Sequence, residues 1–220
     1  MKNDEVLFIK NYLDEDLLDH ISKNIKANEN LFRTIPTKFG FNIPFHVIDG
    51  NELNRVMPEL LNIANTKIKD EMEKFVRVPL RLISDPVRRI RIHRYLKNSE
   101  GFMWHRDGAE FTALIVLTNS LEGGTEIIPI KQSRWILPFV YLFPFTILLN
   151  KFSWPTKLFK PYKLIGKTGD ASFLKGGRSV HRTTSLKESG DRQVLAISYD
   201  PVDKKQMKIW DFLANKLNYE

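Results

Sequence analysis

The sequence has no cysteine, and this absence limits the chemistry that the chain can support. Without thiolates, neither a disulfide framework nor a cysteine-ligated zinc or iron-sulfur site can form. Any protein-bound metal must therefore be held by histidine, aspartate or glutamate. The lack of cysteine does not decide the cellular compartment. We expect a cytoplasmic protein, with a peripheral membrane location as the alternative.

Long hydrophobic runs are also scarce. The uncharged run WILPFVYLFPFTILL, residues 135–149, is shorter than the ~20 residues that a membrane-spanning helix needs. Pro138 and Pro144 interrupt it further. We therefore do not expect this run to span a bilayer.

Acidic residues are absent between Lys131 and Lys167. The chain has 34 basic and 26 acidic residues, a net charge of +8, so seven of the eight net positive charges fall in this segment. They belong to Lys131, Arg134, Lys151, Lys157, Lys160, Lys163 and Lys167. The segment also holds nine aromatic residues, among them Trp135, Phe139 and Phe143.

The remaining patterns predict one α+β domain over residues 1–220. Asp14 is placed to cap a helix whose apolar residues Leu17, Leu18, Ile21 and Ile25 repeat at helical spacing, and residues 51–76 keep a similar period, with Pro58 near a start or a kink. From about residue 87 the period changes to two, which is typical of strands. The runs are RRIRIHRYL, TALIVLT, GDASFL and RQVLAISY.

A metal site is predicted by the motif FMWHRDGAE. His105 and Asp107 are two residues apart, so on a strand or its extended end both side chains project to one face. The best candidate for a third ligand is His181, which follows a strand-like run and has polar neighbours. Two histidines and one carboxylate form a facial triad that leaves metal positions open.

Two further residues are candidates for binding a carboxylate cosubstrate. Arg192 opens the strand RQVLAISY, and a planar guanidinium binds a carboxylate through two parallel hydrogen bonds. Tyr95 is a candidate hydroxyl donor, and alternation places it on one face with Arg91 and His93. We assign no metal role to His20, His46 or His93, which fall outside the motif.

These motifs occur in an order that resembles the prolyl-hydroxylase-like branch of the iron(II)- and 2-oxoglutarate-dependent oxygenases. The series is Tyr95, Gly101, His105 with Asp107, EGGTEI at 122–127, GDASF at 169–173, His181 and Arg192. The resemblance covers roughly residues 88–200. It implies a double-stranded β-helix, or jelly-roll, core with N-terminal helices packed on one sheet. It also implies iron(II) on the triad, 2-oxoglutarate on Arg192 and Tyr95, and O2 as the oxidant.

Within this resemblance, residues 1–86 are the N-terminal strand and helices, 87–200 the jelly-roll core and 201–220 a C-terminal helix. Residues 131–167 are an insert, because the connection from EGGTEI to GDASF is longer than usual in the family. The insert is interpreted either as a buried hairpin over the barrel or as an interfacial element whose aromatics enter lipid headgroups. Nucleic-acid binding is disfavoured, since a phosphate groove would intersperse charge more evenly.

The function expected from the sequence is hydroxylation of an apolar or lipid-linked small molecule with release of succinate and CO2. Protein or peptide prolyl hydroxylation is the alternative enzyme activity. A non-catalytic jelly-roll module that binds membranes is the alternative outside the enzymes. The sequence does not name the substrate or the oligomeric state.

Overall fold

The structure is a computed structural model, which describes residues 4–35, 45–96, 100–119, 123–136, 159–184, 186 and 190–204. Its strands form two antiparallel sheets. The larger sheet has the order β1 (Val6–Ile9), β10 (Ala171–Leu174), β7 (Phe111–Asn119), β12 (Arg192–Pro201), β5 (Ile90–Tyr95), β3 (Phe45–Ile48) and β2 (Arg33–Ile35), and β4 (Leu80–Leu82) also pairs with β12. The smaller sheet has the order β6 (Phe102–His105), β11 (Val180–Thr183), β8 (Thr125–Ile128) and β9 (Tyr162–Leu164).

The first helix, α1 (Glu15–Ala27), begins where the sequence predicts. The backbone N–H of Leu17 donates to the Asp14 carboxylate at 2.9 Å, which satisfies one of the free N–H groups of the first turn. Ile21 and Ile25 are buried on one face, as the helical spacing of apolar residues requires. A short 3-10 turn, η1 (Glu29–Leu31), follows.

The second helical stretch is broken at Pro58. It comprises α2 (Gly50–Val56), α3 (Pro58–Ile63), a π-helical turn η2 (Ala64–Ile68) and α4 (Lys69–Val76). Pro58 takes the first position of α3, where its missing N–H costs no hydrogen bond. The sequence predicted a start or a kink at this residue, and the structure has a new helix start there.

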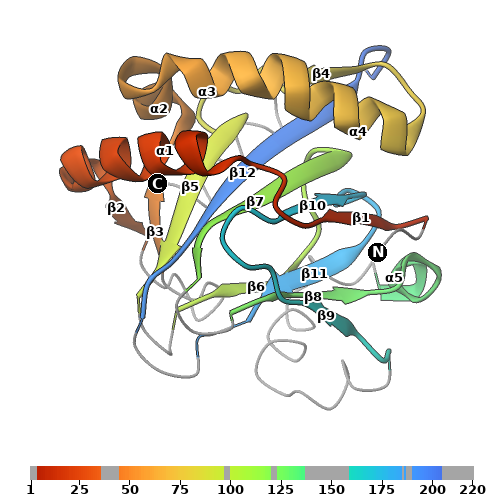
Figure 1. The fold of residues 1–220 in the computed structure, drawn as a ribbon. Coiled ribbons are helices and arrows are strands. Elements are labelled where there is room, and N and C mark those ends of the chain that lie inside the picture. The colour runs from red at the N-terminus through yellow and green to blue at the C-terminus, as the bar shows by residue number, and fades with distance from the viewer. Residues whose placement is uncertain are drawn as a thin grey trace.

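Helices α1, α2, α3 and α4 lie together on one face of the larger sheet, and the smaller sheet lies against the other face (Figure 1). The strand alternation predicted for β5 and β12 is confirmed. Ile90 and Ile92 belong to the core that faces the helices, together with Leu195 and Ile197. The alternate residues of both strands therefore face the space between the sheets.

The smaller sheet closes that space. A cluster of buried side chains joins Val6 and Leu174 of the larger sheet to Ile127 and Leu164 of the smaller one. Sheet-on-sheet packing of this kind is typical of a jelly roll.

The segment 131–167 is described only at its two ends. It begins within α5 (Ile130–Ile136) and includes β9 at the edge of the smaller sheet. Residues 137–158, with Phe139 and Phe143, lie outside the described residues, as does most of the predicted C-terminal helix at 201–220. In the described part of the chain, no helix has the length and apolar character needed to cross a membrane.

Candidate metal centre

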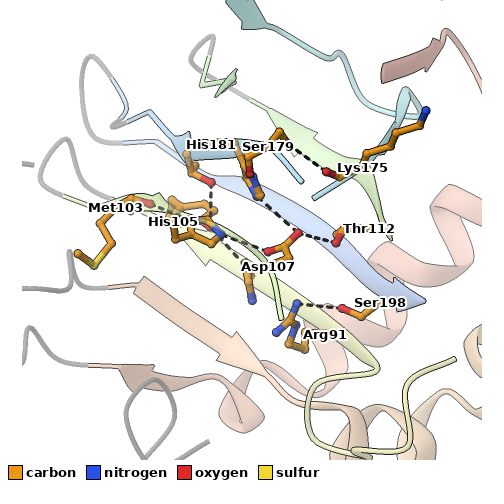
Figure 2. Close-up of polar contacts among 12 residues, drawn as sticks. Arg91, Met103, His105, Asp107, Thr112, Lys175, Ser179, His181 and Ser198 are labelled. Atoms are coloured by element: carbon orange, nitrogen blue, oxygen red, sulfur yellow. Dashed lines mark hydrogen bonds and ion pairs between the residues drawn. The ribbon is translucent and has the colours of Figure 1, made fainter. Parts of the chain in front are cut away.

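Three predicted ligands come together at one end of the space between the sheets. His105 is the last residue of β6, Asp107 follows two residues later, and His181 lies on β11 directly opposite His105. One ligand atom from each of the three residues can be chosen so that all lie within 4.8 Å of one another. In Figure 2, dashed lines join the Asp107 carboxylate to both imidazoles.

Both imidazoles direct Nε2 toward the place where the three ligand atoms meet. His105 Nδ1 lies 2.7 Å from the Met103 carbonyl oxygen, and His181 Nδ1 lies 3.2 Å from that of Ser179. Because a carbonyl only accepts, each Nδ1 carries the proton in these hydrogen bonds. The Nε2 atoms lie 3.3 and 3.5 Å from the two carboxylate oxygens of Asp107. In its neutral form, each ring would direct an Nε2 lone pair toward a shared site, as metal binding requires.

Asp107 is held by contacts of its own. The Thr112 hydroxyl donates to Asp107 Oδ2 at 2.5 Å, and the Asp107 backbone N–H donates to the Gly176 carbonyl at 3.2 Å. A Cβ added at Gly176 would lie 2.1 Å from Asp107 Oδ2. The carboxylate therefore occupies space that a side chain at position 176 would take.

The charges of the triad favour an ionised carboxylate. Burial alone would raise the pKa of Asp107, but the charge of His181 and hydrogen bonds from both imidazoles hold it well below its usual range. Burial, with the nearby His181, lowers the pKa of His105. For His181, burial opposes the charged form, but Asp107 overrides it and raises the pKa.

Arg192 lies deeper between the sheets. It is the first residue of β12, it pairs with Tyr95 of β5, and it is 3% exposed. Its guanidinium carbon lies 5.6 Å above the Tyr95 ring. Among the described residues, Arg192 Nε is buried and has no hydrogen-bond partner. Burial lowers the pKa of this guanidinium, so the site favours an anion that would offset the loss of hydration.

The face of β5 between these two points is polar, as alternation predicted. Tyr95 is buried, and its hydroxyl lies 3.4 Å from His93 Nδ1 and 3.5 Å from Thr183 Oγ1. Among the described residues, His93 Nε2 has no hydrogen-bond partner. Burial first, then the charges of Arg91 and His105, place the pKa of His93 well below its ordinary value. His93 is therefore a neutral residue that lines the interior.

No protein-family model and no curated protein matches this sequence. Solved structures do match. The α-ketoglutarate-dependent carbocyclase SnoK of nogalamycin biosynthesis superposes with a TM-score of 0.68 at 15% identity, over 91% of this chain and 90% of SnoK. HygX from Streptomyces hygroscopicus, with nickel, 2-oxoglutarate and hygromycin B bound, gives 0.65 at 14% identity, over 90% of this chain and 84% of HygX.

This chain has the fold of the iron(II)- and 2-oxoglutarate-dependent oxygenases. The epimerase SnoN, also α-ketoglutarate-dependent, agrees with a TM-score of 0.63 at 15% identity, over 90% of this chain and 78% of SnoN. The predicted jelly-roll fold class is thereby confirmed. Identities this low establish the fold alone, and the prolyl-hydroxylase-like branch remains a prediction.

The residues present fit the cofactors that this fold implies. Two imidazole nitrogens and a carboxylate oxygen are a donor set suited to iron(II), and the buried Arg192 suits a carboxylate. Sequence reasoning identified these residues together with Tyr95, but it missed the contacts of Thr112 and Gly176 with Asp107. The paired glycines of KGGRS, just before His181, were the available signal for a close approach of the backbone.

Proposed function

We propose that this chain is an iron(II)- and 2-oxoglutarate-dependent dioxygenase that hydroxylates a small molecule. The observation that supports this most directly is the convergence of His105, Asp107 and His181 in the same interior as the buried Arg192. A surface cluster of histidines and acids would have no need of a buried guanidinium, and Arg192 is 3% exposed.

In this proposal each residue has a defined role. His105, Asp107 and His181 hold the metal, and the carbonyls of Met103 and Ser179 fix the two imidazoles with Nε2 inward. Arg192 binds the distal carboxylate of 2-oxoglutarate, with the Tyr95 hydroxyl as a second donor. When bound, iron(II) with 2-oxoglutarate and O2 supplies the oxidising power to hydroxylate a C–H bond, releasing succinate and CO2. The role of the protein residues is to hold and orient the bound groups.

A small-molecule substrate agrees with the structural relatives. HygX was solved with hygromycin B, and SnoK and SnoN belong to nogalamycin biosynthesis. We extend the proposal to an apolar or lipid-linked substrate that is approached through peripheral membrane contact of residues 131–167. Trp135 supports this extension because it is 79% exposed, beside Lys131 and Arg134. A peptide substrate has no specific support.

The central test is spectroscopic. Iron(II) and 2-oxoglutarate are added without oxygen to the metal-free protein, and the visible charge-transfer band of their chelate is recorded. We expect a band in the wild type that His105→Ala and His181→Ala abolish. A folded wild type without the band would contradict the assignment and favour a non-catalytic module.

Substrate class and membrane contact need separate tests. A peptide and a detergent-like amphiphile are compared for protection of the cofactor-loaded protein against heating. Stabilisation by the peptide alone would reject the lipid-linked substrate. Trp135→Ser should weaken sedimentation with vesicles that contain anionic lipid, and wild-type protein that does not sediment with them would reject the membrane contact.

A further inference from the structure

A second arginine lies on the same inner wall as Arg192, at the other end. Arg91 and Tyr95 are four residues apart on β5, and both side chains belong to the face between the sheets. Tyr95 pairs with Arg192, whereas Arg91 pairs with Ala196. At the usual rise per residue, the two arginine levels are roughly 13 Å apart along the strand.

Arg91 lies at the same height along the strands as Asp107, the carboxylate of the proposed metal site. Arg91 Nη2 donates to the Ser198 hydroxyl at 3.4 Å, and Ser198 pairs with Thr112 across β12 and β7. Thr112 in turn donates to Asp107. Figure 2 shows the Arg91–Ser198 and Thr112–Asp107 contacts in one view. His93 lies between the two arginines on this wall, and the charges of Arg91, Asp107 and Arg192 all act on its imidazole.

2-Oxoglutarate does not account for Arg91. In the proposed function, the distal carboxylate of this molecule binds Arg192, and its keto-acid end would bind the metal held by the triad. Both carboxylates of 2-oxoglutarate are then bound. Arg91 lies two residues farther along β5 than His93, on the side away from Arg192. A guanidinium at this place is suited to a different ligand.

We infer that Arg91 binds an oxyanion of the substrate, a carboxylate or a phosphate, and so selects anionic molecules and places them beside the metal. This inference rests on the proposed function and narrows its substrate class to amphiphiles with an anionic head. The planar guanidinium offers parallel donors to such a group. His93 Nε2, buried and unpartnered among the described residues, provides a second polar contact on the same wall.

The test separates cosubstrate from substrate. Arg91→Met keeps the apolar stem of the side chain and removes its charge, and Arg91→Lys keeps the charge without the planar fork. Arg106→Met is the matched control, because Arg106 is exposed and lies between the metal ligands in sequence. Each variant is titrated with 2-oxoglutarate in anaerobic iron(II), with the charge-transfer band as readout. Arg192→Met is included for comparison.

The loaded proteins are then titrated with hexanoate, hexyl phosphate and hexanol, which share a chain and differ in head group. We expect 2-oxoglutarate affinity within about twofold of wild type in Arg91→Met, against a loss of at least about tenfold in Arg192→Met. Hexanoate or hexyl phosphate should perturb the wild-type and Arg106→Met bands. The same probes should bind at least about tenfold more weakly to Arg91→Met, with Arg91→Lys intermediate.

The outcomes are distinguishable. The absence of a band in wild type would remove the proposed function itself. If the wild type shows the band but Arg91→Met and Arg192→Met lose affinity for 2-oxoglutarate equally, the inference is overturned, since Arg91 would then bind the cosubstrate. Equal binding of hexanol and the anionic probes, or binding of none, would also overturn it. A preference for hexyl phosphate over hexanoate, or the reverse, would identify the head group.

Discussion

His105 and His181 are direct partners on adjacent antiparallel strands, and their ring centroids lie 4.3 Å apart. This pairing joins two residues that are 76 positions apart in the sequence. Asp107 lies only two residues after the end of β6 and contacts both rings. The geometry of the site therefore depends on the register of β6 with β11 and on the loop contacts that hold Asp107.

Gly176→Ala tests the loop contact. The added methyl would lie 2.1 Å from Asp107 Oδ2 and 3.0 Å from Thr112 Oγ1, so the carboxylate must move. We expect metal affinity to fall by about 10- to 100-fold, as when other supporting contacts of metal ligands are removed. Gly108→Ala is the control, because its added methyl meets only the end of the Arg88 side chain at 3.4 Å. Equal metal affinity in both variants would contradict the role of Gly176.

Thr112→Val tests the hydrogen bond to Asp107. Valine keeps the shape of threonine but cannot donate, so one oxygen of the carboxylate loses its partner. We expect roughly 10- to 100-fold weaker iron(II) binding, measured by titration of the metal-free protein. Thr112→Ser retains the hydroxyl and should restore most of the affinity. Failure of serine to restore binding would indicate a packing effect instead.

Tyr199→Phe tests the junction between sheet and helices. The Tyr199 hydroxyl is buried and donates to the Ala64 carbonyl, at the start of the π-helical turn, at 2.6 Å. Phenylalanine would leave a buried carbonyl without this partner, so the free energy of unfolding should fall by about 1–3 kcal/mol in urea. Tyr12→Phe is the control, because it removes an exposed 3.2 Å bond to the Lys67 carbonyl and should cost less than about 0.5 kcal/mol. Equal losses would contradict the prediction.

The hydrogen bonds of Glu73 lead us to expect that the stability of the protein depends on pH. A hydrogen bond from the Leu80 N–H, and then one from Lys69, lower its pKa below the ordinary 4.5. A carboxyl whose pKa is lower in the folded state stabilises it fully above the ordinary pKa. This contribution is lost as the pH falls through the folded value. Glu73→Gln should therefore lower stability near neutral pH and flatten its decline below about pH 4.5 in urea unfolding. If the variant keeps the wild-type dependence of the unfolding free energy on pH in this range, the role assigned to Glu73 is contradicted.

Local patterns were enough to predict the elements that carry the site. The Asp14 cap, the new helix start at Pro58 and the alternation of β5 and β12 all follow from spacing that a few neighbouring residues determine. The same alternation placed Arg91, His93 and Tyr95 on one inner face. Short strands such as β2 and β4 carry too few residues for a periodic signal, and the sequence did not reveal them.

The candidate ligands were chosen by residue type, order and family resemblance, while their convergence depends on strand pairing. His46 lies 3.4 Å from Glu100, and His20 lies 3.0 Å from Glu59, so neither joins the triad. The sequence excluded them from the motif, and the structure shows their partners.

The sequence by itself determined the absence of thiolate chemistry, the element types and the residues able to bind a metal and a carboxylate. These properties follow from composition and from side-chain periodicity along one segment. Only the tertiary structure decided that Thr112 and Gly176 support Asp107 and that Arg91 stands at the level of the metal site. Those relations arise between strands distant in sequence, where the register is set by packing of the whole core and leaves no local signal.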